Sequence, residues 1–400
     1  MTDLPRSAST VIVGGGVVGA AAAYFLTDRG ETDVLLLERE RLGAGTSGGG
    51  LGGIRHQFVD ELDVRLSVLA TAFWREYDAF TGGSHEFHER GYLFIADSDA
   101  GLRSLREPLP LYERIGVPVE MVSQDRIAQL VPGIRVDDLA GGRYCARDGY
   151  GDPLDALAGF AAAAVLEGAR VAEGVEVTSL LRTGDRVTGV RTATGDVSAE
   201  RVLLASGVWT APLAATAGVG VPIWPYARSL MEAGPYPFLS RIPMVIELES
   251  GFHFRPKGAQ QRFAMPNLTT DGSVEKAPAA PPEAFGPPPP RPDVPASLEP
   301  WVRARAAWRH PAFADIRISR SWSCFYEMTP DDHPVVGRVP GVDGLYVAAG
   351  FSGHGFMHAP ATAQLVVEEM LDGSATTLDI TDLSLDRFRT GRRPFTPTVL

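Results

Sequence analysis

The chain has 400 residues, of which 44% are hydrophobic and 22% are charged, a composition typical of a soluble globular protein. Its 37 basic and 49 acidic residues give a net charge of −12, which argues against nucleic acid and anionic membrane surfaces as partners. The length favours two connected domains. No stretch has the features of a signal peptide or a membrane span, and only two cysteines occur, so we expect a cytoplasmic protein.

A glycine turn between two apolar runs dominates residues 10–40. The first run ends in the turn, a helix of small residues follows, and the second run finishes on Glu38. In such a unit Gly14 allows the tight turn, Gly16 lets the backbone approach a pyrophosphate, and Gly19 lets helix and strand pack closely. The N-terminus of the helix also favours phosphate groups. The whole turn consists of Gly14, Gly15, Gly16, Val17, Val18 and Gly19.

The acid at the end of the second run distinguishes between nucleotides. Glu38 is placed to accept hydrogen bonds from the ribose hydroxyls, and its charge disfavours a 2′-phosphate. The predicted ligand is therefore FAD or NAD rather than NADP, with Arg39 beside Glu38 in the nucleotide site.

A glycine-rich loop follows over residues 43–53. Its glycines cannot form a stable helix or strand by themselves, but they allow the backbone to approach a large flat ligand. Arg55 is the first strong charge after the loop. Periodicity and composition then predict a helix over residues 61–80, a strand over 91–96, a helix over 102–115 and a strand over 117–122.

The middle of the chain alternates short helices and strands. Asp152 and Pro153 open a helix that runs to Ala164, with Asp152 as its N-cap. Further on, we expect short strands over 169–171 and 175–177, a hairpin over 187–197, and a buried strand over 201–209 that runs into a glycine turn.

The next segment is predicted to be antiparallel over residues 222–270, with strands over 244–248 and 252–255. Prolines then cluster over residues 271–300, where they exclude a helix or a central strand. We interpret this segment as an extended surface excursion rather than a domain linker.

The C-terminal third contains the most specific pattern. Cys324 precedes Thr329-Pro330-Asp331 by five residues. A strand over 344–349 then enters the glycine-containing segment 350–357, and a helix is predicted from Pro360 to Met370 with its end at Gly373. A helix N-terminus at such a turn stabilises negative charge, as on a reduced flavin.

Together these segments resemble the D-amino-acid oxidase superfamily of FAD enzymes, and particularly its sarcosine-oxidase-like branch. The resemblance covers most of the chain and is most specific where Thr329-Pro330-Asp331 is followed by GFSGHGF. It implies an α/β (α+β) protein with two domains. The domains would be a discontinuous, Rossmann-like FAD-binding domain over 1–85, 148–218 and 318–380, a substrate domain with a mainly antiparallel sheet over 86–147 and 219–317, and a C-terminal tail over 381–400.

The resemblance also implies which residues bind FAD. In the family the nucleotide turn holds the pyrophosphate, Glu38 binds the adenosine ribose, and Val177 meets the adenine through its backbone. The other cofactor positions that it implies are Ser47, Gly48, Ala205, Gly207, Trp209, Gly350, Phe351, Gly353, His354, Gly355, Phe356 and Met357. No metal is expected.

Cys324 has the position of a flavin-linked cysteine. In the sarcosine-oxidase-like branch, a cysteine five residues before Thr-Pro-Asp forms a thioether with the flavin, and Tyr326 also matches that branch. A covalent link through Cys324 is therefore expected, and the alternative is a small buried packing residue. Histidyl attachment is disfavoured, because glycines occupy positions 48–50.

Arg55 matches the arginine that binds the substrate carboxylate in relatives, a task for which a planar guanidinium is suited; an ordinary salt bridge is the alternative. The sequence departs from sarcosine oxidases in two places. Met357 replaces a second carboxylate-binding lysine, and neither Lys257 nor Arg262 can be matched to the lysine that activates oxygen. The predicted catalytic group is Arg55, His56, Tyr326, His354 and Met357.

We therefore expect an FAD-dependent enzyme that oxidises the C–N bond of a secondary amine or amino acid by hydride transfer to the flavin. The imine would hydrolyse, and oxygen would reoxidise the flavin with release of hydrogen peroxide, or another acceptor would do so. The alternatives are a 2-hydroxy-acid or D-amino-acid dehydrogenase, with His56 or His354 as the base for a hydroxy acid, a flavin-binding assembly factor with little turnover, and an NAD-dependent dehydrogenase.

Overall fold

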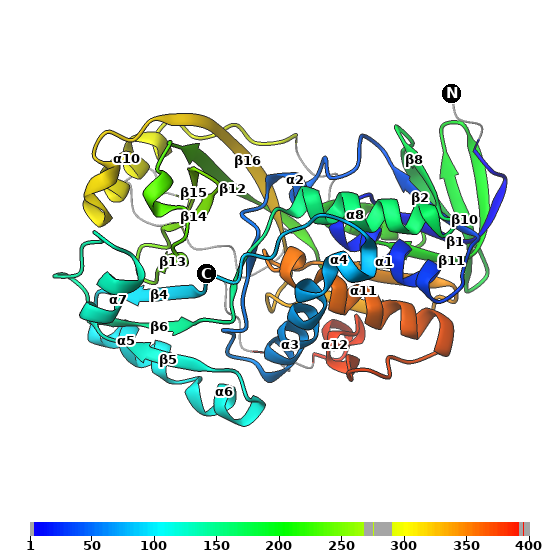
Figure 1. The fold of residues 1–400 in the computed structure, drawn as a ribbon. Coiled ribbons are helices and arrows are strands. Elements are labelled where there is room, and N and C mark those ends of the chain that lie inside the picture. The colour runs from blue at the N-terminus through cyan, green and yellow to red at the C-terminus, as the bar shows by residue number, and fades with distance from the viewer. Residues whose placement is uncertain (1–3, 268–274, 276–289, 392–394, 396–400) are drawn as a thin grey trace.

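The computed structural model describes residues 4–267, 275, 290–391 and 395. Two eight-stranded sheets organise these residues, one at the right and one at the left of the molecule in Figure 1. This arrangement confirms the predicted α/β fold with a second, mainly antiparallel sheet.

The first sheet contains the predicted nucleotide unit. Its strands, in spatial order, are β17 (Val335–Arg338), β18 (Leu345–Ala349), β11 (Gly195–Leu204), β1 (Ser7–Val13), β2 (Val34–Glu38) and β8 (Arg170–Glu173). Off this path, β10 (Arg186–Thr192) pairs with β11, and β9 (Val177–Thr183) pairs with β10. β1 pairs in parallel with both β2 and β11, so the turns after β1 and β11 reach the same edge of the sheet. The predicted hairpin is the antiparallel pair β10–β11, and β11 is one continuous strand of ten residues.

Small side chains let helix α1 (Val17–Asp28) pack on several neighbours. The alanines at positions 20–23 are fully buried, because α1 contacts both α8 (Pro153–Leu166) and α11 (Gly355–Asp372). Helix α8 begins as predicted, since Asp152 Oδ1 accepts the N–H of Leu154 at 3.0 Å and Pro153 takes the first helical position.

The second sheet extends away from the nucleotide unit. Its strands, in spatial order, are β16 (Ile318–Met328), β12 (Trp224–Ala233), β15 (Gln260–Met265), β14 (His253–Lys257), β13 (Met244–Glu247), β4 (Tyr92–Ala96), β6 (Gly141–Cys145) and β5 (Val119–Val122). Only the β13–β4 pair is parallel. The fully buried rings of Phe252, Phe254 and Phe263 pack against α10 (Leu298–Arg309) and η3 (Pro311–Phe313).

Strand β16 belongs to the second sheet and returns the chain to the first. It pairs with β12 along its whole length. Its first residue, Ile318, is the position where the third segment of the FAD-binding domain was predicted to begin. The chain rejoins the first sheet only after β16, with β17. A short antiparallel pair, β3 (Gly53–Ile54) with β7 (Gly149–Tyr150), joins two other segments that pass between the sheets.

The remaining elements are short apart from one helix. They are α2 (Thr46–Gly49), α3 (Glu61–Arg75), α4 (Tyr77–Thr81), α5 (Asp99–Arg106), α6 (Leu109–Ile115), α7 (Gln124–Leu130), η1 (Gly207–Trp209), α9 (Thr210–Ala215), η2 (Pro237–Leu239), η4 (Thr381–Leu383) and α12 (Asp386–Arg389). The helix predicted over 61–80 divides into α3 and α4. The helix predicted over 102–115 divides into α5 and α6, because Pro108 cannot continue α5.

Helix α11 begins at Gly355, five residues before the predicted start at Pro360. Tertiary contacts hold this early turn. Trp74 Nε1 donates to the carbonyl of Met357 at 3.0 Å, and Ser67 Oγ lies 2.9 Å from His358 Nε2. The helix N-terminus therefore lies within the glycine segment itself.

The C-terminal segment packs on the Thr-Pro-Asp motif. Arg387 in α12 forms a buried, two-pronged ion pair with Asp331, with N–O distances of 2.7 and 3.1 Å. The predicted proline excursion over 271–300 falls largely outside the described residues, and α10 begins near its end. None of the helices in the described part of the chain is long and apolar enough to cross a membrane.

Candidate active site

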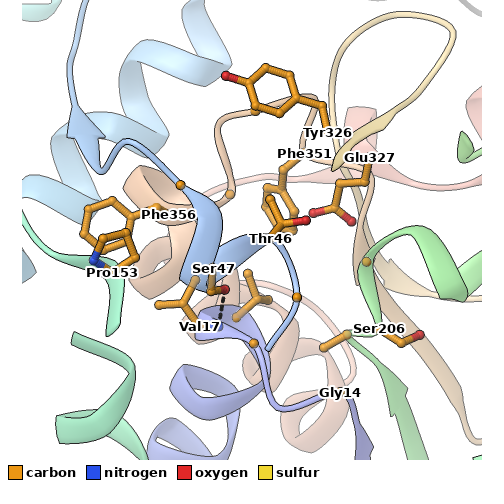
Figure 2. A pocket seen from close by; sticks show the side chains of 18 of the residues that line it. Gly14, Val17, Thr46, Ser47, Pro153, Ser206, Tyr326, Glu327, Phe351 and Phe356 are labelled. Carbon is orange, nitrogen blue, oxygen red and sulfur yellow. Dashed lines mark hydrogen bonds between the residues drawn. The ribbon is translucent and has the colours of Figure 1, made fainter. Parts of the chain in front are cut away.

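A cavity of about 530 Å3 lies where the two sheets meet. Its wall includes the turn after β1, the glycine-rich loop before β3, part of β16, the loop after β11 and the loop between β18 and α11 (Figure 2). The volume is in the range of pockets that bind small molecules and cofactors. Segments that are far apart in sequence therefore form one site.

The nucleotide turn presents backbone to this cavity. Gly14 has φ +114°, and a Cβ at this position would lie 2.4 Å from the carbonyl oxygen of Ala205. Helix α1 then begins at Val17 with no side-chain cap, and Ser47 Oγ accepts the N–H of Val17 at 3.0 Å. A helix N-terminus whose N-cap residue, Gly16, has no side chain, beside a turn that only glycine fits, suits a pyrophosphate.

The end of β2 forms a second part of the wall. Glu38 Oε2 accepts the N–H of Gly15 at 2.8 Å, and the Glu38 carbonyl accepts the N–H of Val175. The guanidinium carbon of Arg39 lies 4.0 Å from the ring centroid of Trp209. Glu38, Arg39, Val177 and Trp209 all line the cavity, and this arrangement fits the adenosine half of FAD.

The turn before α11 packs closely on β16. Gly353 has φ +96°, and a Cβ there would lie 2.6 Å from the ring of Tyr326. The next helical turn adds apolar wall at Phe356 and Met357. Figure 2 shows Tyr326 and Phe351 on the side of the cavity away from Gly14.

Arg55 is a buried cation without an acidic partner among the described residues. It is 4% exposed, and its Nη2 lies 3.2 Å from His354 Nε2. Its Nε is buried with no hydrogen-bond partner. Its guanidinium carbon lies 4.6 Å from the ring centroid of Phe58 and 5.3 Å from that of Phe94, which compensates the charge only in part.

The two histidines that line the cavity are neutral. Burial, with the nearby charge of Arg55, holds the pKa of His354 well below its usual range. Burial and the charges of Arg228 and Arg55 lower the pKa of His253 to about 3. Arg55 is therefore the positive charge in this part of the described cavity wall, where the neighbouring groups are Tyr92, Met244, Ile246 and Tyr326.

Glu327 lines the cavity, although the sequence patterns did not identify it as a site residue. Its Oε2 accepts the N–H of Gly350 at 2.9 Å. Burial raises the pKa of Glu327 to about 7, although hydrogen bonds from the backbone of Gly350 and Phe351 oppose this rise. The signal in the sequence that could have identified Glu327 is its position directly after Tyr326, a predicted site residue.

The structure places most of the predicted site residues on the cavity wall. Those that do not line it are Gly15, Gly19, Gly48, His56, Cys324 and Gly350. Of the four glycines, Gly19 lies in α1 and Gly48 in α2, and each of the four is next in sequence to a residue that lines the cavity. The roles of all these residues remain predictions.

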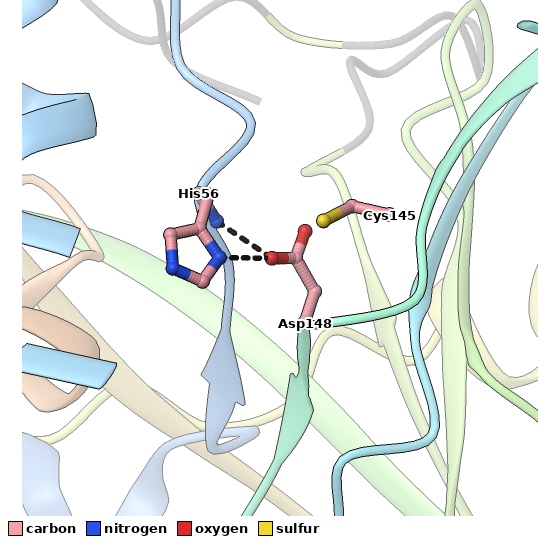
Figure 3. A group of neighbouring side chains, drawn as sticks. All are labelled: His56, Cys145 and Asp148. Atoms are coloured by element: carbon pink, nitrogen blue, oxygen red, sulfur yellow. Dashed lines mark hydrogen bonds and ion pairs between the residues drawn. The ribbon is translucent and has the colours of Figure 1, made fainter. Parts of the chain in front are cut away.

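His56 lies in a buried polar cluster with Asp148 and Cys145 (Figure 3). Asp148 Oδ1 accepts the backbone N–H of His56 at 2.9 Å and lies 2.6 Å from its Nδ1, and Asp148 Oδ2 accepts from Gln57 Nε2. Burial, with the charge of Asp148, raises the pKa of Cys145, so its thiol stays protonated. Because hydrogen bonds satisfy the carboxylate, this cluster fixes the backbone next to Arg55.

Cys324 lies in β16 beside the glycine-rich loop. Its Sγ is 3.6 Å from the carbonyl oxygen of Gly49, and a Cβ on Gly49 would lie 2.6 Å from that of Cys324. Burial raises the pKa of Cys324 to about 12, which disfavours the thiolate.

Neither candidate for the oxygen-activating lysine lines the cavity. Lys257 is 43% exposed and pairs with Asp152 at 2.9 Å. Arg262 pairs with Glu232 at 3.1 Å and with Asp152 at 3.5 Å. Both side chains are held by acids at the edge of the second sheet.

Most of the chain matches a known protein family. Residues 9–369 match the family described as FAD dependent oxidoreductase. The chain is 31% identical over 383 residues to 4-methylaminobutanoate oxidase (formaldehyde-forming) of Paenarthrobacter nicotinovorans, covering 93% of this chain but 44% of that protein. It is 27% identical to glycine oxidase of Geobacillus kaustophilus, covering 94% of this chain and 96% of that protein.

A solved structure with the same fold is L-proline dehydrogenase from P. horikoshii. It has a TM-score of 0.86 and 28% sequence identity, over 97% of this chain and 99% of that one. Glycine oxidase from Geobacillus kaustophilus has a TM-score of 0.82 and 26% identity, over 96% and 99%.

Proposed function

The chain belongs to the family of FAD dependent oxidoreductases, which act on amines or amino acids, and on this premise we propose that it oxidises the C–N bond of a secondary amine or amino acid that carries a carboxylate. FAD, when bound, supplies the hydride acceptor. The chain's own residues bind and orient the substrate beside it and exclude water.

The proposal depends on the buried guanidinium of Arg55, which has no acidic partner among the described residues. A buried cation with a free Nε and no acidic partner among the described residues is costly unless a ligand compensates it. A carboxylate does so best, because it can accept two parallel hydrogen bonds from one guanidinium. The neutral His354 beside Arg55 adds no competing charge.

The wall around Arg55 favours an uncharged amine. The groups there are aromatic rings, aliphatic side chains and the neutral His253, with no carboxylate among Tyr92, Met244, Ile246, His253 and Tyr326. An ammonium ion would lose its hydration without gaining a partner. The substrate therefore binds as the free amine, which has the lone pair needed for hydride loss from the adjacent carbon.

Three apolar side chains set the size of the substrate. The cavity wall includes Met244, Ile246 and Met357. Met357 occupies the position at which sarcosine oxidases have a lysine that binds the carboxylate of a small substrate. We therefore favour an N-alkyl or cyclic amino acid with one carboxylate and an apolar remainder.

The N-terminus of α11 stabilises the charge that follows hydride transfer. This helix has 18 residues and begins within the cavity wall at Gly355. Its positive dipole end and free N–H groups favour negative charge at that point. With Lys257 and Arg262 held by acids, we propose that oxygen reoxidises the enzyme slowly and that another acceptor is used.

The 2-hydroxy-acid alternative is less well supported. It requires a base on the hydroxyl near neutral pH, and of the two predicted bases His354 has its pKa held well below the usual range by burial. His56 does not line the cavity.

Matched substrate pairs test the proposal. Steady-state rates with an artificial acceptor and with oxygen would be compared for N-methyl amino acids and proline, for the same amines without the carboxylate, and for 2-hydroxy acids. We expect the carboxylate-bearing amines to react roughly 100-fold faster than their decarboxylated counterparts. Faster turnover of a hydroxy acid, or no turnover of any amine by the FAD-loaded protein, would contradict the proposal. The second result would favour an assembly factor.

A further inference from the structure

Glu327 is an acid in a cavity that binds a negatively charged cofactor. It is the next-to-last residue of β16, and its carboxylate lies between two segments of the cavity wall. On one side Oε2 accepts the N–H of Gly350, and on the other an ideal Cβ at Gly207 would lie 3.5 Å from the same oxygen. In Figure 2 the side chain points from β16 toward the middle of the cavity.

No cation pairs with Glu327 in the described part of the chain. The neighbouring α2 and η1 have no charged side chain. The loop before α11 contributes only the neutral His354, and Tyr326 on β16 has a raised pKa and is neutral. From β12, the guanidinium of Arg228 lies over the rings of Tyr226 and Tyr326.

Cofactor binding increases the electrostatic cost of a carboxylate here. FAD has negative charge on its pyrophosphate, and it would cover the part of Glu327 that faces the cavity. Both effects, repulsion and loss of hydration, favour the protonated form. A neutral carboxylic acid has one O–H donor in addition to its acceptor oxygens, whereas the carboxylate can only accept.

We propose that Glu327 is a cofactor-binding residue that holds a proton, and that it binds FAD as the neutral carboxylic acid by donating a hydrogen bond to an oxygen of the cofactor. Free protein must then take up a proton on Glu327 to bind FAD whenever the pH exceeds the pKa of this group. FAD affinity therefore falls as the pH rises. This inference concerns the cofactor and does not depend on the substrate proposed above.

FAD affinity as a function of pH tests the inference. All measurements use a Cys324→Ser background, so that the cofactor is not covalently attached, and the dissociation constant is taken from the fluorescence of FAD during titration with protein. With a pKa of about 7 in the free protein, the affinity should fall roughly 30-fold from pH 6 to pH 8.5. Glu327→Gln, whose amide also donates, should bind FAD at pH 8.5 as tightly as the parent does at pH 6.

Glu176→Gln is the matched control. Glu176 also lines the cavity but is exposed, so its removal should leave the pH dependence intact. The parent protein provides a second test that needs no Glu327 variant, because calorimetry in two buffers of different ionisation enthalpy counts protons. Close to one proton should be taken up per FAD at pH 8.5 and close to none at pH 6. The inference is overturned if no proton is taken up, or if Glu327→Gln keeps the parent's pH dependence.

Discussion

Replacing Arg55 should lower the affinity for carboxylate ligands without lowering the stability of the ligand-free protein. Replacement by methionine keeps an unbranched apolar chain among Phe58, Phe94 and Tyr92 but removes the buried charge. If Arg55 binds the substrate carboxylate, affinity for carboxylates must fall. Because the charge has no acidic partner among the described residues, the ligand-free protein should not lose stability.

The size of the first effect follows from the geometry. A guanidinium that binds a carboxylate makes two charge-assisted hydrogen bonds, each of which contributes about 1.5–3 kcal/mol. The lower end of that range gives a loss of about 3 kcal/mol, or roughly 100-fold in affinity. Arg55→Lys keeps the charge and loses the planar fork, so its loss should be smaller.

A carboxylate inhibitor without an amine measures this directly. Its dissociation constant would be taken from the change that it causes in the flavin absorption, for the parent, Arg55→Met and Arg55→Lys. Thermal unfolding without inhibitor gives the second quantity. Arg55 does not bind the substrate carboxylate if Arg55→Met binds the inhibitor within a few-fold of the parent. Arg55 is a structural residue if Arg55→Met unfolds well below the parent temperature without ligand.

Three further predictions concern the rest of the fold. Although burial opposes protonation of His333, its 2.6 Å contact with Asp63 raises the pKa of the histidine. The ion pair therefore stabilises the fold fully below about pH 6.5, and this stabilisation is lost as the pH rises through the folded-state pKa. His333→Gln should lower the melting temperature more at pH 6 than at pH 9. Arg387→Ala leaves Asp331 buried without its partner and should cost about 3–5 kcal/mol in urea unfolding; a loss below 1 kcal/mol would contradict this. Acid precipitation of FAD-loaded protein should leave the colour in the pellet, and Cys324→Ser should release it; release from the parent would make the thiol a packing residue.

Local signals in the sequence predicted the turn after β1 and the start of α8 as the structure has them. The turn at Gly14 and the N-cap at Asp152 depend on φ, on backbone approach and on neighbouring residues, so they can be read from a short window. The start of α11 could not be read in this way. Pro360 is a strong local signal for a helix start, but contacts of Met357 and His358 with α3 let the helix begin earlier in the chain, at Gly355.

The substrate end of the cavity depends on contacts between distant residues. Arg55 and His354 are separated by 299 positions, and no periodicity predicts their contact. Met244 and Ile246 line the cavity because β13 pairs in parallel with β4, a pairing that the expected antiparallel pattern does not indicate. The raised pKa of Glu327 likewise follows from burial by segments that only the fold brings together.

Amine oxidation by this protein is tested most simply by anaerobic mixing of the FAD-loaded protein with a carboxylate-bearing secondary amine, followed through the visible absorption of the oxidised flavin. We expect the colour to bleach in a single turnover, and the same amine without its carboxylate to bleach it roughly 100-fold more slowly. A protein that holds FAD but keeps its colour with every N-alkyl, cyclic and primary amino acid would contradict the central claim.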